Sequence, residues 1–184
     1  KSYFLEEAMT IIDPEVEFVS GHPMAGREKK GYGYASKEVF KNANYILIEH
    51  PVNQKECISF MERFVGTLGF KSVKIMSPQA HDEIISFTSQ LPHAIAVSLI
   101  NSDNEKYETG KYIGDSYRDL TRIANINENL WSELFLRNSD YLLASIEAFE
   151  EQLDLIKVAL KDNDERLLKD LFIKSSLRRE KLEK

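Results

Sequence analysis

The chain has 184 residues, and its 24 Lys and Arg residues against 30 Asp and Glu residues give a formal net charge of −6. This acidic balance counts against a nucleic-acid-binding protein, because proteins that bind the phosphate backbone carry a basic surplus or a basic stripe. No apolar run approaches the roughly 20 residues that a membrane-spanning helix needs. Cys57 is the single cysteine, so we expect neither an internal disulfide nor a thiolate metal cluster. The expectation is a cytoplasmic protein that binds no metal, no nucleic acid and no membrane.

The first part of the chain, residues 1–76, alternates between helical and strand periodicity. The pattern predicts, in order, helix 3–12, strand 16–19, helix 37–42, strand 45–48, a helix from 53 or 54 to 66, and strand 70–76. Strands that alternate with helices over short joints are typical of a parallel α/β sheet. Three strands make a thin sheet, and the chain enters its first helix without a starting Met. We therefore expect that the N-terminal part of a longer protein is missing from this chain.

The strand signals stop after Met76. Ser77-Pro78 is a favourable helix opening, because an N-cap hydroxyl precedes a proline at the first helical position. Helices are predicted over 78–100 with a break or kink at Pro92, and over 116–124, 131–135, 139–160 and 165–184. The 139–160 helix has apolar residues at alternating spacings of four and three, a narrow seam suited to packing against another helix. We predict a partial α/β domain over 1–76 and an all-helical domain over 77–184.

The densest local motif is Ser20–Gly31, directly after the first predicted strand. Ligands of open α/β sheets bind beyond the carboxyl ends of strands. Gly21 and Gly26 allow close approach of the backbone to a ligand, and Pro23 stiffens the turn beside His22. A histidine at this place can act as a base near neutral pH. It can equally well cap a turn, and spacing alone does not decide between the two.

A second group of polar residues lies on helix 78–100: His81, Asp82, Ser89 and His93, with Pro92 beside them. Ser89 and His93 are one helical turn apart, so their side chains are neighbours. A kink at Pro92 exposes polar groups that can bind an anionic or carbonyl ligand. The residues alone favour the plainer alternative, in which Ser89 bonds to its own helix and His93 is a core histidine.

A third group lies on helix 116–124. Arg118 and Arg122 share one face, where like charges are unfavourable unless an anion neutralises them. Arg122 can grip a carboxylate through a two-pronged contact, although an ion pair with Asp119 is the more common outcome for such an arginine. Trp131 is the single tryptophan, a residue type usually found in a core or an interface.

In this order, the motifs resemble the prephenate dehydrogenase family of tyrosine biosynthesis. The matching stretches are GHPMAGREKKG at 21–31, SPQAHD at 77–82, TSQLPH at 88–93, RDLTRIA at 118–124, and Trp131. The resemblance covers residues 1 to about 160, and motifs that recur in this order are specific. It favours the functional alternatives for His22, Ser89, His93 and Arg122.

The resemblance implies a Rossmann-like dinucleotide-binding domain, here represented by the C-terminal part of its sheet, followed by an all-helical domain that forms a homodimer. The active site is expected in the cleft between them. The implied reaction is the NAD-dependent oxidative decarboxylation of prephenate to 4-hydroxyphenylpyruvate, with NADP not excluded. The alternatives are an arogenate or dual-specificity cyclohexadienyl dehydrogenase, or, for this chain alone, an inactive helical dimerisation module.

The resemblance also implies roles for single residues. His22 matches the catalytic histidine, which accepts a hydrogen bond from the ring hydroxyl as hydride leaves the same carbon. Arg122 matches the arginine that holds a substrate carboxylate, and Ser89 and His93 match polar groups of the same pocket.

Further matches concern access, the dimer and the cofactor. Glu28 and Asp119 match acids around that arginine that control access to the site. Trp131 matches a residue that approaches the site across the dimer interface. Gly21 and Pro23 are expected beside the cofactor.

The sequence departs from the family pattern in two places. It contains no glycine-rich phosphate loop, because Gly31–Ser36 begins like G-x-G-x-x-G but lacks the preceding strand and the third glycine. The family has a run of glycines before the position of Arg118, where this chain has Ile113–Tyr117. We therefore expect the chain alone to be inactive.

Overall fold

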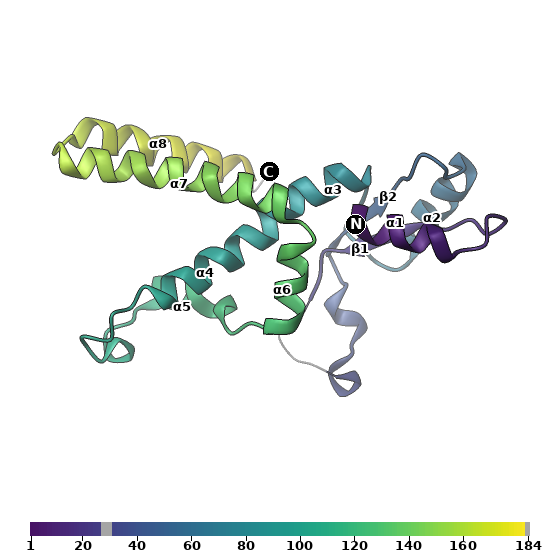
Figure 1. Cartoon of the computed structure of the whole chain (residues 1–184), viewed down its shortest axis with the longest axis horizontal. Helices are drawn as coiled ribbons and strands as arrows, with labels where there is room; N and C mark the ends of the chain where they lie inside the picture. Colours follow the sequence, from purple (N-terminus) through teal and green to yellow (C-terminus); the bar gives the residue numbers. More distant parts are fainter. Residues whose placement is uncertain (27–30, 183–184) are drawn as a thin grey trace.

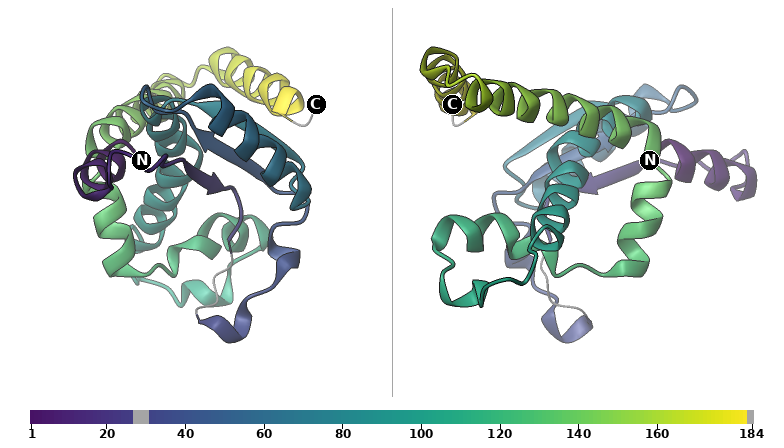
Figure 2. Two further views of the ribbon diagram at one scale, coloured as in Figure 1. Left: turned by 90° about the vertical axis from the view of Figure 1, so that its right-hand side faces the viewer. Right: turned by 60° about the vertical axis from the view of Figure 1, so that its left-hand side comes forward.

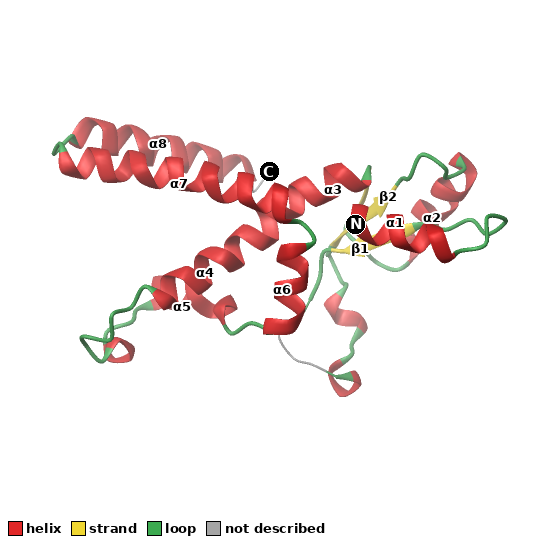
Figure 3. Cartoon of the chain, in the orientation of Figure 1, coloured by secondary structure: helices red, strands yellow, loops and turns green. Residues whose placement is uncertain are grey.

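The computed structural model describes residues 1–26 and 31–182. Its strands are confined to one end of the molecule, and helices form the rest (Figure 3). This arrangement is a small Rossmann-like sheet followed by an all-helical region, as the sequence predicts (Figure 1). Within the described residues, no helix combines the length and apolar character needed to cross a membrane.

The sheet has three strands in the order β1 (Ser20–Pro23), β2 (Asn44–Ile48) and β3 (Ser72–Met76). β2 and β3 are parallel, and they confirm the second and third predicted strands. β1 runs antiparallel to β2, with His22 opposite Ile46. The predicted strand 16–19 is therefore wrong in position, and the described sheet is mixed rather than wholly parallel.

The segment before β1 is held by hydrogen bonds between Glu17 and Phe18 and the start of α2 instead of by a neighbouring strand. Asn53 Nδ2 donates to the Phe18 carbonyl at 2.8 Å and to Glu17 Oε1 at 3.0 Å. The Gln54 amide, at the N-cap of α2 (Lys55–Thr67), also donates to Glu17 Oε1. Strand pairing begins only after this anchor, so His22 lies within a strand and not beyond its end.

Helices cover both faces of the sheet. Leu47 is fully buried on the face that contacts α2, whose own buried residues are Ile58 and Val65. The opposite face carries the main apolar cluster, formed by Leu5, Ile46, Ile48 and Ile85 with Phe18, Met24 and Met76 packed against it. Ile85 belongs to α3 (Pro78–Ile85), so the helical region shares its core with the sheet.

The remaining elements follow the predicted pattern with shifted bounds. They are α1 (Ser2–Ile11), the 3-10 turns η1 (Tyr32–Tyr34), η2 (Lys37–Val39), η4 (Thr109–Lys111) and η5 (Arg122–Ala124), and the helices α4 (Leu91–Asn101), α5 (Asp115–Thr121), α6 (Glu128–Leu136), α7 (Ser139–Lys161) and α8 (Glu165–Leu182). The predicted helix 37–42 is only a 3-10 turn, and the predicted helix 116–124 ends in one. The α7 and α8 helices lie side by side as a long hairpin (Figure 2).

The predicted helix 78–100 is interrupted before its proline. The Ser77 side chain caps α3 by accepting a hydrogen bond from the Ala80 amide, as predicted. A π-helical turn, η3 (Ser86–Gln90), then separates α3 from α4. Since Pro92 has no N–H and crowds the preceding turn, the irregularity falls one turn ahead of it. The turn carries Ser89 and Gln90.

Candidate functional site

A cleft with a volume of about 1110 Å³ lies between the sheet and the helical region. It is lined by residues of α1, β1, α3, η3, α4 and α6. Polar and aromatic side chains on its wall include Glu7, His22, His81, Asp82, Ser89, Gln90, His93, Trp131, Glu133, Arg137 and Asn138. The fold thus brings four predicted site residues, His22, Ser89, His93 and Trp131, to one cleft from three separate stretches of the chain.

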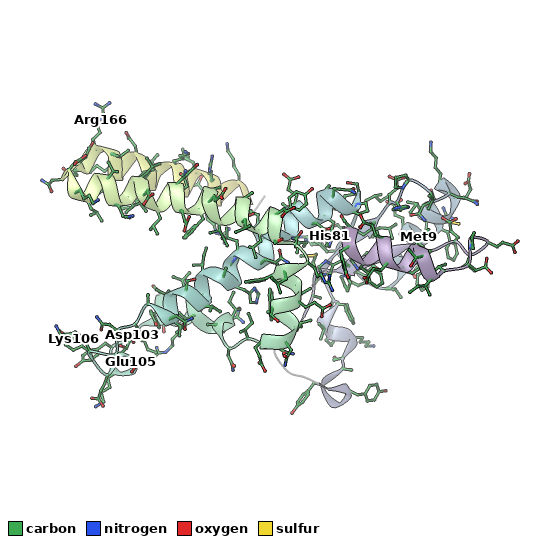
Figure 4. All side chains as sticks on the ribbon, in the orientation of Figure 1. Met9, His81, Asp103, Glu105, Lys106 and Arg166 are labelled. Carbon is green, nitrogen blue, oxygen red and sulfur yellow. The ribbon has the colours of Figure 1, made fainter. Side chains whose placement is uncertain are left out.

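His22 is the first member of a row of three hydrogen-bonded side chains. Its Nδ1 lies 2.8 Å from Nε2 of His81, and Nδ1 of His81 lies 2.8 Å from Oδ1 of Asp82. His81 and Asp82 are buried, at 4% and 7% exposure. His81 lies where α3 meets α1 and the sheet (Figure 4). Sequence reasoning placed both residues on the helix without a role, because nothing local indicates that this helix faces β1.

The surroundings of His22 keep its ring neutral. Burial is the main cause that lowers the pKa of His22 from 6.5 to about 4, with smaller electrostatic contributions from His81 and Lys1. For Asp82, burial acts to raise the pKa, but hydrogen bonds from His81, from the Lys1 amino group and from the Ser2 amide outweigh it and hold the pKa well below its usual range. At neutral pH the row therefore runs from a neutral imidazole in the cleft to a buried carboxylate.

The second histidine of the cleft is held by its own helix and by Trp131. His93 Nδ1 lies 2.8 Å from the carbonyl oxygen of Ser89. Because a carbonyl only accepts, Nδ1 carries a hydrogen. The His93 ring stacks on Trp131 with centroids 3.7 Å apart, and Trp131 meets Phe135 edge-on at 5.7 Å. These contacts fix the ring of His93 beside Ser89.

An amide pair that the sequence did not reveal holds α6 against the rest of the cleft. Asn138 Nδ2 donates to Gln90 Oε1 at 2.7 Å and to the Asp82 carbonyl at 3.0 Å. Gln90 Nε2 in turn donates to the Leu134 carbonyl at 3.0 Å. Buried polar groups need such partners, and here the partners connect α3, η3 and α6. The helix that carries Trp131 is therefore anchored behind the cleft.

Three residues predicted to lie around the substrate are not part of the described wall. Arg122 and Asp119 are exposed and lie outside the lining of the cleft, although Ile123, next to Arg122, is part of it. Glu28 lies outside the described residues. The roles of all three remain predictions. Within residues 1–26 and 31–182, no group of three or more His, Cys, Asp or Glu side chains is placed to hold a metal ion.

Comparison with known proteins assigns the family. Residues 1–74 match the family model described as "Prephenate dehydrogenase, nucleotide-binding domain". Residues 77–174, more than half of the chain, match the model described as "Prephenate dehydrogenase, dimerization domain". The chain belongs to the prephenate dehydrogenase family.

Individual relatives agree with this family. The chain is similar to the prephenate dehydrogenase of Bacillus subtilis, with 29% identity over 89% of this chain and 45% of the relative. It is also similar to the cyclohexadienyl dehydrogenase of Zymomonas mobilis, with 28% identity over 88% of this chain and 57% of the relative. A solved structure of Aquifex aeolicus prephenate dehydrogenase, in complex with hydroxyphenyl propionate and NAD+, matches with a TM-score of 0.77 and 32% identity, covering 89% of this chain and 58% of the other. The chain spans about half the length of these relatives.

Gly21 and Pro23 of the GHPMAG motif are both expected beside the dinucleotide, but their surroundings differ. A Cβ atom at Gly21 would come within 2.1 Å of the Tyr45 hydroxyl, so any other residue there would require the Tyr45 side chain to move. Pro23, in contrast, lines the cleft together with Gly26. Their contact with a cofactor remains a prediction.

Proposed function

We propose that this chain carries the substrate cleft of a prephenate dehydrogenase that oxidatively decarboxylates prephenate to 4-hydroxyphenylpyruvate with NAD, as a step of tyrosine biosynthesis in the cytoplasm. The observation that carries the proposal is a neutral, partly buried His22 whose ring faces a cleft with Ser89 and His93. Membership of the prephenate dehydrogenase family supports this proposal. The proposed division of the chain is a partial dinucleotide-binding domain over 1–76 and a helical substrate-binding and dimerisation domain over 77–184.

In the proposed reaction, His22 accepts a hydrogen bond from the ring hydroxyl of prephenate. An alcohol gives up hydride readily only while its oxygen loses its proton, so a positioned acceptor accelerates this step. The low pKa of His22 supports this role, because it keeps the imidazole neutral at neutral pH. Loss of the ring carboxylate then makes the ring aromatic, which drives the reaction forward.

The remaining groups are proposed to hold the substrate. Ser89 and His93 provide hydrogen-bonding groups on the helical wall, and the Trp131 ring fixes His93. Arg122 is proposed to hold a substrate carboxylate by turning toward the cleft that its neighbour Ile123 lines. Asp119 is proposed to act as its ion-pair partner.

The residues of this chain fit only one end of a dinucleotide. Pro23 and Gly26, which line the cleft together with His22, would hold the nicotinamide end. The sequence offers no glycine-rich loop for the phosphates. When bound, NAD supplies the acceptor for the hydride. We therefore propose that cofactor binding needs residues outside this chain.

The test compares substrates in the whole protein of which this chain is proposed to be part. Initial rates of NADH formation are measured with prephenate and with arogenate. The proposal expects a higher kcat/KM for prephenate. A higher value for arogenate would favour the second candidate, a cyclohexadienyl or arogenate dehydrogenase, which the similarity to the Zymomonas mobilis enzyme keeps open. No turnover of either substrate would overturn the proposed activity.

A further inference from the structure

We propose that His81 and Asp82 position His22 by fixing which nitrogen of its ring carries the proton. The importance of this for turnover rests on the proposed function, but the hydrogen-bond pattern itself can be measured on the chain. The observation behind the proposal is the buried row from the cleft to Asp82, in which both contacts are 2.8 Å.

The direction of the hydrogen bonds follows from the carboxylate end. Ionised Asp82 only accepts, so His81 Nδ1 must carry the hydrogen of their contact. The other oxygen of Asp82 accepts from the Ser2 amide at 2.8 Å, which fixes the orientation of the carboxylate. In its neutral form, His81 with a hydrogen on Nδ1 presents a lone pair at Nε2.

The same reasoning gives the donor and the acceptor of the hydrogen bond between His22 and His81. Its Nδ1 faces the lone pair of His81 Nε2, so it must be the donor. The lone pair of His22 is therefore on Nε2, the nitrogen available to the cleft. The opposite arrangement, with His22 Nδ1 as acceptor, would put an N–H at Nε2, and a donor there cannot accept the proton of a substrate hydroxyl.

The row of His81 and Asp82 also stabilises the His22 ring after it takes up a proton. With Nε2 protonated, His22 still donates from Nδ1 to His81 Nε2, and the charge of Asp82 lies one ring away. An acid that orients a histidine and stabilises its protonated ring is a known arrangement in acyl-transfer enzymes. Here a second imidazole lies between the acid and the base. His81 and Asp82 are thus positioning residues that do not need to touch the substrate.

Asp82→Asn is the sharpest test, because it changes the direction of the bonds with little change in shape. With the amide nitrogen at the place of Oδ1, the substituted side chain would donate to His81 Nδ1, and its oxygen would still accept from the Ser2 amide. The Lys1 amino group, which also donates to Oδ1, would lose this acceptor. His81 would then carry its proton on Nε2, and His22 would become the Nε2–H tautomer. Glu83→Gln is the matched control, because it makes the same chemical change at an adjacent, exposed side chain.

The tautomers are measured by long-range ¹H–¹⁵N correlation NMR of the histidine rings in this chain at neutral pH. The wild type and Glu83→Gln are expected to show His22 protonated at Nδ1, and Asp82→Asn is expected to show it protonated at Nε2. A wild-type His22 protonated at Nε2, or a tautomer that Asp82→Asn leaves unchanged, would overturn the proposal.

Turnover is measured separately on the whole protein with prephenate and NAD. Asp82→Asn is expected to lower kcat by about 10²-fold or more while KM changes by less than about threefold. His81→Gln, whose side-chain oxygen can accept from His22 Nδ1, should retain at least about ten times the kcat of His81→Leu, and so provides a test if Asp82→Asn does not fold. Equal kcat in the wild type and Asp82→Asn, or in the two His81 variants, would contradict positioning. A wild type that shows the expected tautomer without turnover would instead contradict the proposed function.

Discussion

The chemistry of His22 is set by its neighbours more than by its residue type. The chain has four histidines, and among the described residues His22 is the one whose pKa is lowered strongly, mainly by burial. A base with a pKa of about 4 is neutral throughout the physiological range. We therefore propose that this histidine accepts a proton and does not serve as a positive charge for an anionic substrate.

The same shift predicts how stability depends on pH. Between pH 6.5 and about 4, the unfolded chain binds a proton at His22 that the folded chain does not. The free energy of unfolding should therefore fall as the pH is lowered through this window. Urea unfolding across the window measures the slope. The slope should be smaller in His22→Gln and unchanged in His50→Gln, and an equal slope in all three proteins would contradict the shift.

Single residues were predictable where a motif is local. His22, Ser89 and His93 stand out because of the residues beside them, and all three line the cleft. The contacts of His81 and Gln90 were not predictable, because their partners lie 59 and 48 positions away in the chain. Only the packing of α3 against β1, and of η3 against α6, brings those atoms together.

At the scale of elements, the cleft depends on how α6 is attached. Asn138, between α6 and α7, donates two hydrogen bonds to groups of η3 and α3. Gln90 is buried, so removing the donor deprives its side-chain oxygen of this hydrogen bond, whereas the Asp82 carbonyl still accepts from the Ser86 amide. The amide pair formed by Asn138 and Gln90 therefore couples the shape of the cleft to the stability of the helical region.

Asn138→Ala is expected to lower the free energy of unfolding by about 1–3 kcal/mol. Urea unfolding followed by circular dichroism measures the difference. Asn129→Ala is the control, because Asn129 is exposed on α6 and its side-chain amide donates to Glu128 Oε1 at 3.3 Å, at the surface. It should change stability by less than about 0.5 kcal/mol. Equal effects of the two substitutions would contradict the role of the amide pair.

Elements were predictable where their signal is contained in their own residues. β2, α2 and α7 fall close to the predicted ranges, because an apolar run or a helical spacing defines each of them. The strand at 16–19 was wrong, because its alternation does not reveal that Asn53 would occupy the Phe18 carbonyl. A strand needs a hydrogen-bonded partner, and the pairing of β1 with β2 begins only at Ser20 of β1.

At the scale of the whole molecule, the α7–α8 hairpin presents apolar side chains to solvent. Along the predicted seam of α7, Phe149, Leu153 and Leu160 are exposed by 36%, 45% and 65%. On α8, Phe172 and Leu177 are exposed by 59% and 54%. The helical region matches a family model described as a dimerization domain. We propose that this hairpin buries its apolar surface against a second copy of the chain.

Leu153→Glu is expected to weaken the proposed dimer by at least about tenfold in dissociation constant, because it places a charge in an apolar interface. Sedimentation of the chain over a range of concentrations measures the constant. Gln152→Glu adds the same charge one residue away, off the seam, and should leave the constant nearly unchanged. A monomeric wild type, or equal constants for the two variants, would contradict the proposed interface.

His22 is proposed to be the proton acceptor of the reaction, and this role is tested by kcat of His22→Asn in the whole protein. With prephenate and NAD, we expect His22→Asn to lower kcat by about 10²–10⁴-fold without loss of folded structure, and His50→Asn, which changes a histidine outside the cleft lining, to retain the wild-type rate. A His22→Asn protein that turns over prephenate at the wild-type rate would contradict the claim.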